Sequence, residues 1–440
     1  MRWREVSLPR YTDPTYVYDP VRDRTVVFGA NPSFRQTVEY DTTNAWVAAT
    51  TSPTREMGWG GAAYDPTAQR VVCYDGATQP QTWVWNGAAW ATHQENPDMY
   101  LEHFVTHEGR GRVLAVGGFS SSVAIHRLFE WQGAAWVQVP TPTAPPLYGP
   151  NGPLQYFGSA YDVRRDKYVL FSSGTYTKFG YIDLAPVIWE WDATNGWVER
   201  TVPFPGTLHR WNPRAETRFD STRGTILTIV RTGDRWPTSW GFQAYEWDGG
   251  PSWRTLSNQT PPPLGIGWST LTTGFDERRG QWHMQFRGSG QFRSYFFESV
   301  RPATFEVHGS GCAGSLGQSE LRLRHSWTRA WLGQSLETEL TNLPTSTAIV
   351  AVGCDDQHWA GTALPRPLDP IGMPGCLLRV PPESIYAIAG SHQRATLSLP
   401  VPLQAALLGT AIYQQGFAID PAANSLGLTA TNSVRATVGR

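Results

Sequence analysis

The chain has 440 residues, and its 36 Lys and Arg against 37 Asp and Glu leave a net charge of −1, which gives no electrostatic reason to expect nucleic acid or an anionic membrane as a partner. It contains no run of about 20 apolar residues, so we expect no membrane span. The length exceeds one ordinary core, and 43 Gly and 34 Pro disfavour long helices, so these features predict an all-β protein of two domains.

A repeated unit fills residues 1–300. Each copy begins with an aromatic residue followed by Asp, then a short polar turn and a β-rich run that ends near Gly. Five copies begin at Tyr18-Asp19, Tyr64-Asp65, Tyr161-Asp162, Phe219-Asp220 and Phe275-Asp276, and Thr106-His107 begins a degenerate sixth. Their spacing of about 42 to 58 residues is typical of four-stranded propeller blades, so we predict a six-bladed β-propeller.

The second half of each unit places an aromatic residue five or six positions before a Trp, as in Trp131 and Trp136. The sixth unit lacks this Trp, but Trp3-Arg4-Glu5-Val6 matches the segment that begins at Trp136. We therefore expect the N-terminal strand to close the last blade, which removes a free sheet edge. Most Trp residues are expected to pack between blades.

The Asp of each unit is interpreted as structural rather than catalytic. Asp-Pro, as in Asp19-Pro20 and Asp65-Pro66, starts tight turns in which the carboxylate accepts backbone N–H groups. Arg24, Arg70 and Lys167 each follow such an Asp by five residues, and we expect them to pair with it across the turn.

An apolar strand that ends in Gly-Gly, followed by a Tyr and a Trp about six residues apart, resembles the kelch repeat. Gly-Gly is intact at Gly117-Gly118 and is altered in other units, such as Gly29-Ala30 and Gly76-Ala77. The resemblance covers about two thirds of the chain. It implies the propeller fold and says little about function.

Residues 301–440 form the second predicted domain, because the repeat stops after Arg301-Pro302. Strand-length runs at 337–340, 348–352 and 395–399 alternate with turns that contain Pro and Gly. Some of these runs alternate in polarity, as strands with one buried face do. We predict a small antiparallel β-sandwich.

Several short motifs mark this second domain, including Gly311-Cys312-Ala313-Gly314-Ser315, Gly372-Met373-Pro374-Gly375-Cys376 and Asp420-Pro421-Ala422-Ala423-Asn424. The set resembles a C-terminal module of large secreted proteins of planctomycete-like bacteria. The resemblance implies export, with a signal peptide removed before residue 1, and a Cys312–Cys376 disulfide. A Cys354–Cys376 bridge is the alternative.

The sequence contains no strong catalytic motif: it has no Gly-x-Ser-x-Gly elbow, HExxH or P-loop, and no CxxC metal spacing. We expect no cofactor and no metal. On a strand, the rise per residue would place His103 and His107 about 13 Å apart, which is too far for them to share a metal ion. We interpret them as channel or loop residues.

Aromatic residues recur just before the predicted innermost strand of each blade, where a propeller face meets its central channel. With neighbouring Arg residues they form a predicted binding ring, which comprises Trp59, Tyr100, Tyr156, Trp211, Trp268, Arg210 and Arg214. Sugar rings stack on flat aromatic faces, and Arg binds uronate or sulfate groups. Each aromatic residue taken alone is as readily explained by packing between blades.

Three functions remain open from the sequence. The first is a secreted, non-catalytic binding or scaffold protein, with an extracellular glycan or a protein as partner. The second is a propeller enzyme that acts on carbohydrate as an epimerase or lyase, with Glu56, Glu102, His103 and Arg214 as candidates. The third is a self-assembling cell-surface protein, since near-zero net charge eases association. The oligomeric state is not indicated.

Overall fold

Strands form nearly all the regular structure in the residues that the computed structural model describes. These residues are 2–6, 14–29, 37–40, 46–49, 61–75, 81–93, 100–119, 127–145, 148–149, 152–175, 187–205, 215–232, 241–256, 268–276, 280–288, 291–298, 301–325, 327–402 and 404–439. Helical structure among them is limited to the 3-10 turns η1 (Glu108–Arg110), η2 (Asp369–Ile371) and η3 (Ala405–Leu407). In this part of the chain no helix has the length and apolarity to cross a bilayer. Two units, Met1–Glu298 and Ser299–Arg440, each have their own core.

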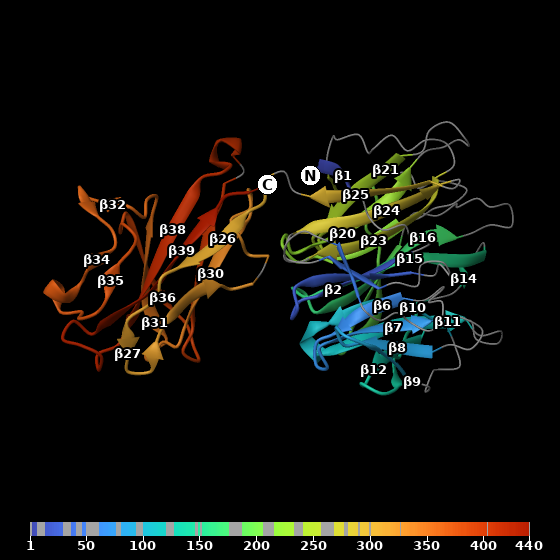
Figure 1. Cartoon of the computed structure of the whole chain (residues 1–440), viewed down its shortest axis with the longest axis horizontal. Helices are drawn as coiled ribbons and strands as arrows, with labels where there is room; N and C mark the ends of the chain where they lie inside the picture. The colour runs from blue at the N-terminus through green and yellow to red at the C-terminus, as the bar shows by residue number, and fades with distance from the viewer. Residues whose placement is uncertain are drawn as a thin grey trace. The chain divides into compact units, whose positions relative to one another are not determined.

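Six antiparallel sheets form the blades of the first unit (Figure 1). Blade 1 contains β2 (Thr15–Asp19), β3 (Arg24–Phe28), β4 (Val38–Tyr40) and β5 (Trp46–Ala48). Blade 2 contains β6 (Gly61–Asp65), β7 (Arg70–Asp75), β8 (Gln81–Trp85) and β9 (Trp90–His93). Blade 3 contains β10 (Tyr100–His107), β11 (Arg112–Phe119), β12 (Arg127–Trp131) and β13 (Trp136–Val139).

The other three blades follow the same order from the innermost strand outwards. Blade 4 contains β15 (Gly152–Asp162), extended by β14 (Tyr148–Gly149), then β16 (Lys167–Thr175), β17 (Val187–Asp192) and β18 (Gly196–Arg200). Blade 5 contains β19 (Ala215–Asp220), β20 (Thr225–Thr232), β21 (Gly241–Trp247) and β22 (Arg254–Thr255). Blade 6 contains β23 (Trp268–Asp276), β24 (Gln281–Gly288), β25 (Gln291–Glu298) and β1 (Arg2–Val6).

The ring closes through the N-terminal strand, as predicted. Strand β1 lies outermost in blade 6 and pairs antiparallel with β25, with Arg2 opposite Glu298 and Val6 opposite Ser294. The innermost strands also contact one another around the whole ring, in the order β2, β6, β10, β15, β19, β23 and back to β2. The predicted six-bladed propeller is therefore confirmed.

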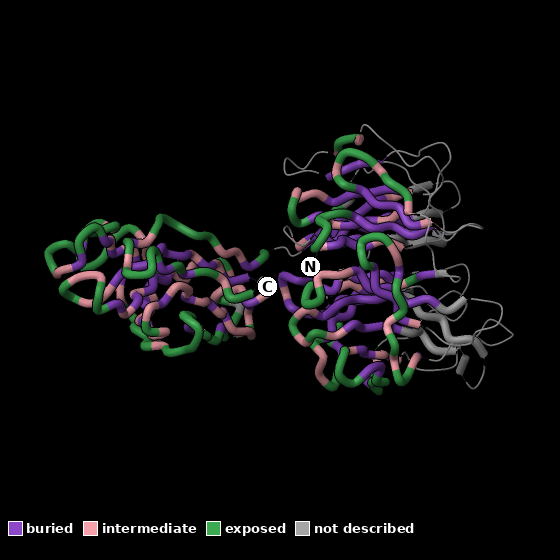
Figure 2. Tube along the Cα trace, turned by 90° about the horizontal axis from the view of Figure 1, so that it is seen from below, coloured by how far each residue is buried: buried purple, intermediate pink, exposed green. Residues whose placement is uncertain are grey.

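Buried aromatic and aliphatic residues fill the interfaces between blades, and Figure 2 shows these strands as largely buried. Between blades 2 and 3, Trp136 lies edge-on to Phe104 with ring centroids 5.5 Å apart. Its indole N–H donates to the Thr82 hydroxyl at 2.9 Å, in the preceding blade. In the same way Trp85 of blade 2 donates to Glu39 of blade 1. The predicted packing role holds for the buried Trp residues of the propeller, such as Trp85 and Trp136.

Two glycines of innermost strands allow neighbouring blades to approach closely. A Cβ added to Gly158 on β15 would lie 2.7 Å from the backbone nitrogen of Thr217 on β19. A Cβ added to Gly274 on β23 would lie 2.0 Å from the Cβ of Tyr16 on β2. Only glycine fits at these two contacts.

In blades 1 to 5 the last side chain of the innermost strand holds the turn that follows. Asp19 Oδ1 accepts the backbone N–H groups of Val21 and Arg22, both at 3.1 Å. The same two bonds are made by Asp65, Asp162 and Asp220. In blade 3, His107 Nδ1 replaces the carboxylate and accepts the Arg110 N–H at 3.2 Å. The predicted turn role of the Asp residues is confirmed, and the degenerate unit is explained.

The predicted ion pairs across these turns are wrong for Arg24 and Lys167. Asp19 binds Arg22, three residues on, at 2.7 Å, and Arg24 lies 3.6 Å from Glu39 instead. In blade 4, likewise, Asp162 binds Arg165, three residues on, and Lys167 pairs with Asp192 instead. The turn brings the residue three positions after the Asp back over the carboxylate. The residue five positions after the Asp begins the second strand of the blade, which lies beside the third strand.

The second unit is a sandwich of two antiparallel sheets. One sheet has the order β26 (Thr304–His308), β39 (Leu428–Thr437), β38 (Ala411–Ile419), β31 (Thr347–Gly353) and β36 (Ser384–Ala389). The other has the order β29 (Glu320–Leu323), β30 (Ser335–Thr341) and β37 (Ala395–Pro400). Three short hairpins pair β27 (Ala313–Gly314) with β28 (Gly317–Gln318), β32 (His358–Trp359) with β33 (Thr362–Ala363), and β34 (Arg366–Pro367) with β35 (Leu377–Leu378).

The core of the sandwich joins the two sheets, with Leu321 and Leu340 of one packed against Val350 and Val434 of the other. A second cluster surrounds a disulfide between Cys312 and Cys376, the pairing that the resemblance implies. Cys354 is free and exposed, and Cys73 is free and buried in blade 2.

Candidate functional site

The predicted binding ring falls largely outside the part of the chain that the structure describes. Trp59, Trp211, Arg210 and Arg214 lie outside the described residues, as does Glu56. The backbones of Tyr100, Tyr156 and Trp268 lie in β10, β15 and β23, but their side chains are also outside the description. The ring therefore stays a prediction, with three of its members placed on innermost strands.

A second group of polar residues lies midway along these same innermost strands. Five side chains from three blades form what we call the channel cluster: Glu102, His103, Glu216, Arg218 and Thr273. Glu216 Oε2 accepts the Thr273 hydroxyl of blade 6 at 3.2 Å and lies 3.7 Å from the Arg218 guanidinium. His103 Nε2 lies 3.6 Å from Glu102 Oε2.

An electrostatic interaction links the two halves of the channel cluster. Arg218 of blade 5 is near enough to His103 of blade 3 for its charge to contribute to lowering the His103 pKa, although blade 4 stands between these blades. Between these blades, Gly158 on the innermost strand of blade 4 lies close to Thr217 of blade 5, and Ser159 beside it is buried.

A bulge in β10 sets the direction of His103. The register between β10 and β11 shifts between Glu102 and Val105, and His103 has a φ of 55°. A bulge inserts an extra residue and re-aims the side chains around it, and a side-chain-bearing residue at positive φ needs support from its surroundings. The Tyr168 hydroxyl of blade 4 donates a hydrogen bond to the His103 carbonyl oxygen and supplies such support.

Burial shifts the pKa values of the two neighbouring groups of blade 3 in opposite directions. Desolvation, with a smaller contribution from Arg218, lowers the pKa of His103 to about 4, so the imidazole is neutral at pH 7. Desolvation by the channel wall also raises the pKa of Glu102, although half of its side chain remains accessible to solvent (51%). Perturbed groups of this kind are concentrated at functional sites.

The cluster offers complementary chemistry within a small space. The Arg218 guanidinium presents several donors that suit a carboxylate or a sulfate. Carboxylates, a neutral imidazole and a hydroxyl are suited to sugar hydroxyl groups. Among the described residues, no three His, Cys, Asp or Glu side chains gather closely enough to hold a metal ion.

Sequence reasoning found Glu102 and His103 but missed Glu216, Arg218 and Thr273, because it searched the loops that precede the innermost strands. The usable signal was the aromatic-Asp motif, which marks where each innermost strand ends. Counting back from Phe219-Asp220 places Arg218 and Glu216 within the innermost strand of blade 5, where a polar side chain is unexpected in a packed ring.

No protein-family model matches the chain, and a comparison with curated protein sequences finds no significant relative. Solved structures are similar at the level of the fold. A protein of unknown function from Dyadobacter fermentans is 11% identical, with a TM-score of 0.44, over 67% of this chain and 99% of its own.

Two further structures have stated activities. A gluconolactonase from Xanthomonas campestris is 13% identical, with a TM-score of 0.39, over 65% of this chain and 86% of its own. The six-bladed fucose-binding lectin of Aleuria aurantia is 12% identical, with a TM-score of 0.35, over 64% of this chain and 93% of its own. Likenesses of this size carry no information on the ligand or activity of this chain.

Proposed function

We propose that the protein is an extracellular binding protein whose kelch-like propeller takes an acidic glycan at its central channel. The proposal is supported by polar side chains on the innermost strands of three blades: Glu216 contacts Thr273 and Arg218, His103 lies beside Glu102, and Arg218 acts on the pKa of His103. Arg218 would bind a uronate or sulfate group, and the remaining members would bind hydroxyl groups.

The predicted aromatic ring extends this site. Tyr100 begins the strand that carries Glu102 and His103, and Trp268 begins the strand that carries Thr273. Aromatic residues at these positions would stack on a sugar while the channel cluster binds its polar groups. The disulfide in the second unit supports a location in an oxidising compartment, in line with secretion from a bacterium of the kind that the C-terminal module indicates.

A binding experiment tests this function. The full chain is applied to an array of neutral, uronate and sulfated glycans, beside Arg218→Gln and Glu102→Gln variants. The matched control is Arg254→Gln, because Arg254 also pairs with a Glu but lies on the outermost strand of blade 5, where it is exposed. We expect Arg218→Gln to weaken binding of acidic glycans by about tenfold or more. Unchanged binding by the Arg218→Gln/Glu102→Gln double variant would rule out the channel as the site.

An enzyme that acts on acidic carbohydrate is the second candidate, and the altered pKa values of Glu102 and His103 favour it. A carboxyl group with a raised pKa, 3.6 Å from a neutral imidazole, can exchange a proton with a substrate as a lyase or an epimerase requires. Incubation with oligouronides would then yield an unsaturated or epimerised product, detected by NMR. Glu102→Gln should abolish the reaction and keep binding, whereas binding without any product would leave the first proposal alone.

A further inference from the structure

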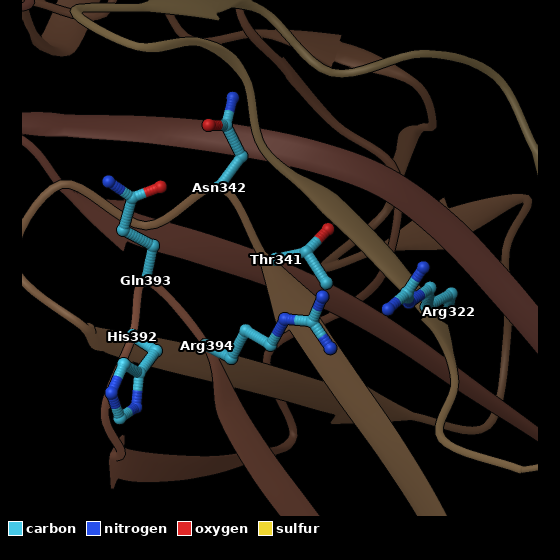
Figure 3. Close-up of a pocket in the computed structure, with 6 residues that line it drawn as sticks. All are labelled: Arg322, Thr341, Asn342, His392, Gln393 and Arg394. Carbon is cyan, nitrogen blue, oxygen red and sulfur yellow. The ribbon is translucent and has the colours of Figure 1, made fainter. Parts of the chain in front are cut away.

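A shallow pocket of about 290 Å³ lies in the second unit, at one end of the three-stranded sheet (Figure 3). Its lining is wholly polar and comprises Arg322, Thr341, Asn342, His392, Gln393 and Arg394. Figure 3 shows the side chains of Arg394 and Arg322 directed toward each other near Thr341, with His392 and Gln393 contributed by the neighbouring turn.

The sequence places these residues together through strand alternation. Along β30 every second residue is buried, so Glu339 and Thr341 share the outward face while Leu340 enters the core. Arg322 on β29 lies directly opposite Glu339 in the register, and Arg394 immediately precedes β37 on the other side of β30. The outward face therefore carries Arg322 and Arg394 on either side of Glu339, and it also carries Glu320, which lies opposite Thr341.

Positive charge exceeds negative charge in this pocket. Both Nε and Nη2 of Arg322 donate to Glu339 Oε2, at 3.2 and 2.7 Å. Arg394 Nη1 lies 3.8 Å from the same oxygen, beyond hydrogen-bonding distance, and the Arg394 side chain is 58% exposed. Glu339 thus faces two guanidinium groups, and the residues that line the pocket include two arginines and no carboxylate, so the donors of Arg394 are available to an anion.

The turn beside the two arginines is held rigidly. His392 and Gln393 both have positive φ, at 53° and 61°, in a two-residue turn closed by the Arg394 N–H to the Ser391 carbonyl oxygen at 3.0 Å. Such turns usually employ Asn and Gly, because other residues are strained there. The opposing loop supports the turn, since Leu343 N–H donates to the Gln393 carbonyl oxygen and the Gln393 N–H donates to the Ser346 hydroxyl.

We propose that this pocket binds the acidic group of a single uronate or sulfated sugar residue. Arg394, with Arg322, would bind the carboxylate or sulfate, because planar guanidinium groups match both anions. The Asn342 amide oxygen, the Gln393 amide and the Thr341 hydroxyl would bind neighbouring sugar hydroxyl groups, because the Asn342 amide nitrogen already donates to the carbonyl oxygens of Leu316 and Gln318. The volume is at the lower end for small-molecule sites, and the lining has no apolar pocket that would bind a peptide side chain. This site is independent of the channel proposed above.

The test uses the full chain with four probes: digalacturonate, N-acetylglucosamine 6-sulfate, unsubstituted N-acetylglucosamine and a tri-aspartate peptide. Binding is measured by NMR shifts of the His392 ring protons, assigned with a His392→Asn variant, so that a signal at the propeller channel is not mistaken for this one. The variants are Arg322→Gln/Arg394→Gln and the control Arg435→Gln, which alters an exposed arginine paired with Glu306 at 3.7 Å on the other sheet. Thermal melting verifies that each variant is folded.

We expect saturable shifts of His392 with one or both acidic sugars, and none with the unsubstituted sugar. The double variant should weaken this binding by about tenfold or more, while Arg435→Gln keeps it. The stronger of the two acidic sugars identifies the anion as carboxylate or sulfate. No shift with either acidic sugar, or equal binding by the folded double variant, overturns the proposal. Binding of the aspartate peptide alone would replace the sugar with a protein partner and would also overturn it.

Discussion

Asp220→Asn should stabilise the propeller at pH 7, because it removes a poorly solvated negative charge from the interior of blade 5. In blade 5 the carboxylate of Asp220 is buried, and its pKa rises from 3.8 to about 6, chiefly because of desolvation. Arg223, whose Nε lies 3.2 Å from Glu246, lowers the pKa of Asp220 but offsets the desolvation only in part. An Asn at this position keeps an oxygen to accept the N–H groups of Thr222 and Arg223.

The magnitude follows from that pKa. The difference between 3.8 and about 6, at 1.36 kcal/mol per pKa unit, corresponds to about 3 kcal/mol. The folded state holds the proton more tightly than the unfolded state, so stability falls as the pH rises from about 4 to about 6, and the whole penalty is present above that interval. Asp220→Asn should remove this slope, so the two proteins should agree at pH 4 and differ by up to about 3 kcal/mol at pH 7.

Urea unfolding at several pH values, followed by Trp fluorescence, measures this effect in the propeller, which holds 18 of the 21 Trp residues. Asp162→Asn is the matched control with the opposite sign. Asp162 lies at the same point of blade 4, but Arg165 binds both Asp162 and Glu190, so this variant should lose about 2 kcal/mol. The reasoning is refuted if Asp220→Asn is no more stable than the parent at pH 7, or keeps its slope between pH 4 and 6.

Three further perturbations test the architecture. Gly274→Ala places a Cβ 2.0 Å from that of Tyr16 and should lose about 1–3 kcal/mol in urea unfolding; an unchanged midpoint would contradict the close contact. Cys312→Ala/Cys376→Ala opens a loop of 64 residues and should lose about 4 kcal/mol in thermal unfolding of the second unit, and equal melting would argue against the bridge. Removal of residues 1–6 exposes the edge of β25 and should produce oligomers in light scattering, whereas a monomer would contradict closure by β1.

The blade repeat was readable from the sequence because its physical causes are local. A carboxylate that holds a turn and a Trp that fills an interface recur at nearly fixed offsets, so even Thr106-His107 could be aligned with the other units. The match of Trp3 to Trp136 likewise predicted the closure of blade 6, because an outermost strand has the same neighbours in every blade.

The channel cluster was harder to predict because it depends on contacts between blades that are distant in sequence. Nothing near Arg218 indicates that blade 4 presents Gly158 and Ser159 beside it, or that His103 lies on a bulge. The ion pairs failed for a similar reason, since Arg24 was assigned to Asp19 across the turn, and the third strand brings Glu39 close to Arg24 in space.

The closure by β1 has a consequence for the order in which the chain folds during synthesis. Arg4 and Glu298 are 294 positions apart in the sequence, so β1 leaves the ribosome long before its partner strand β25 is made. Until then it is an unpaired segment, and its charged residues Arg2, Arg4 and Glu5 lower the tendency of that segment to associate with other nascent chains. Ring closure is therefore a late, long-range event, and we expect it to make folding of the propeller slow. This last step can take place only after all six blades have formed.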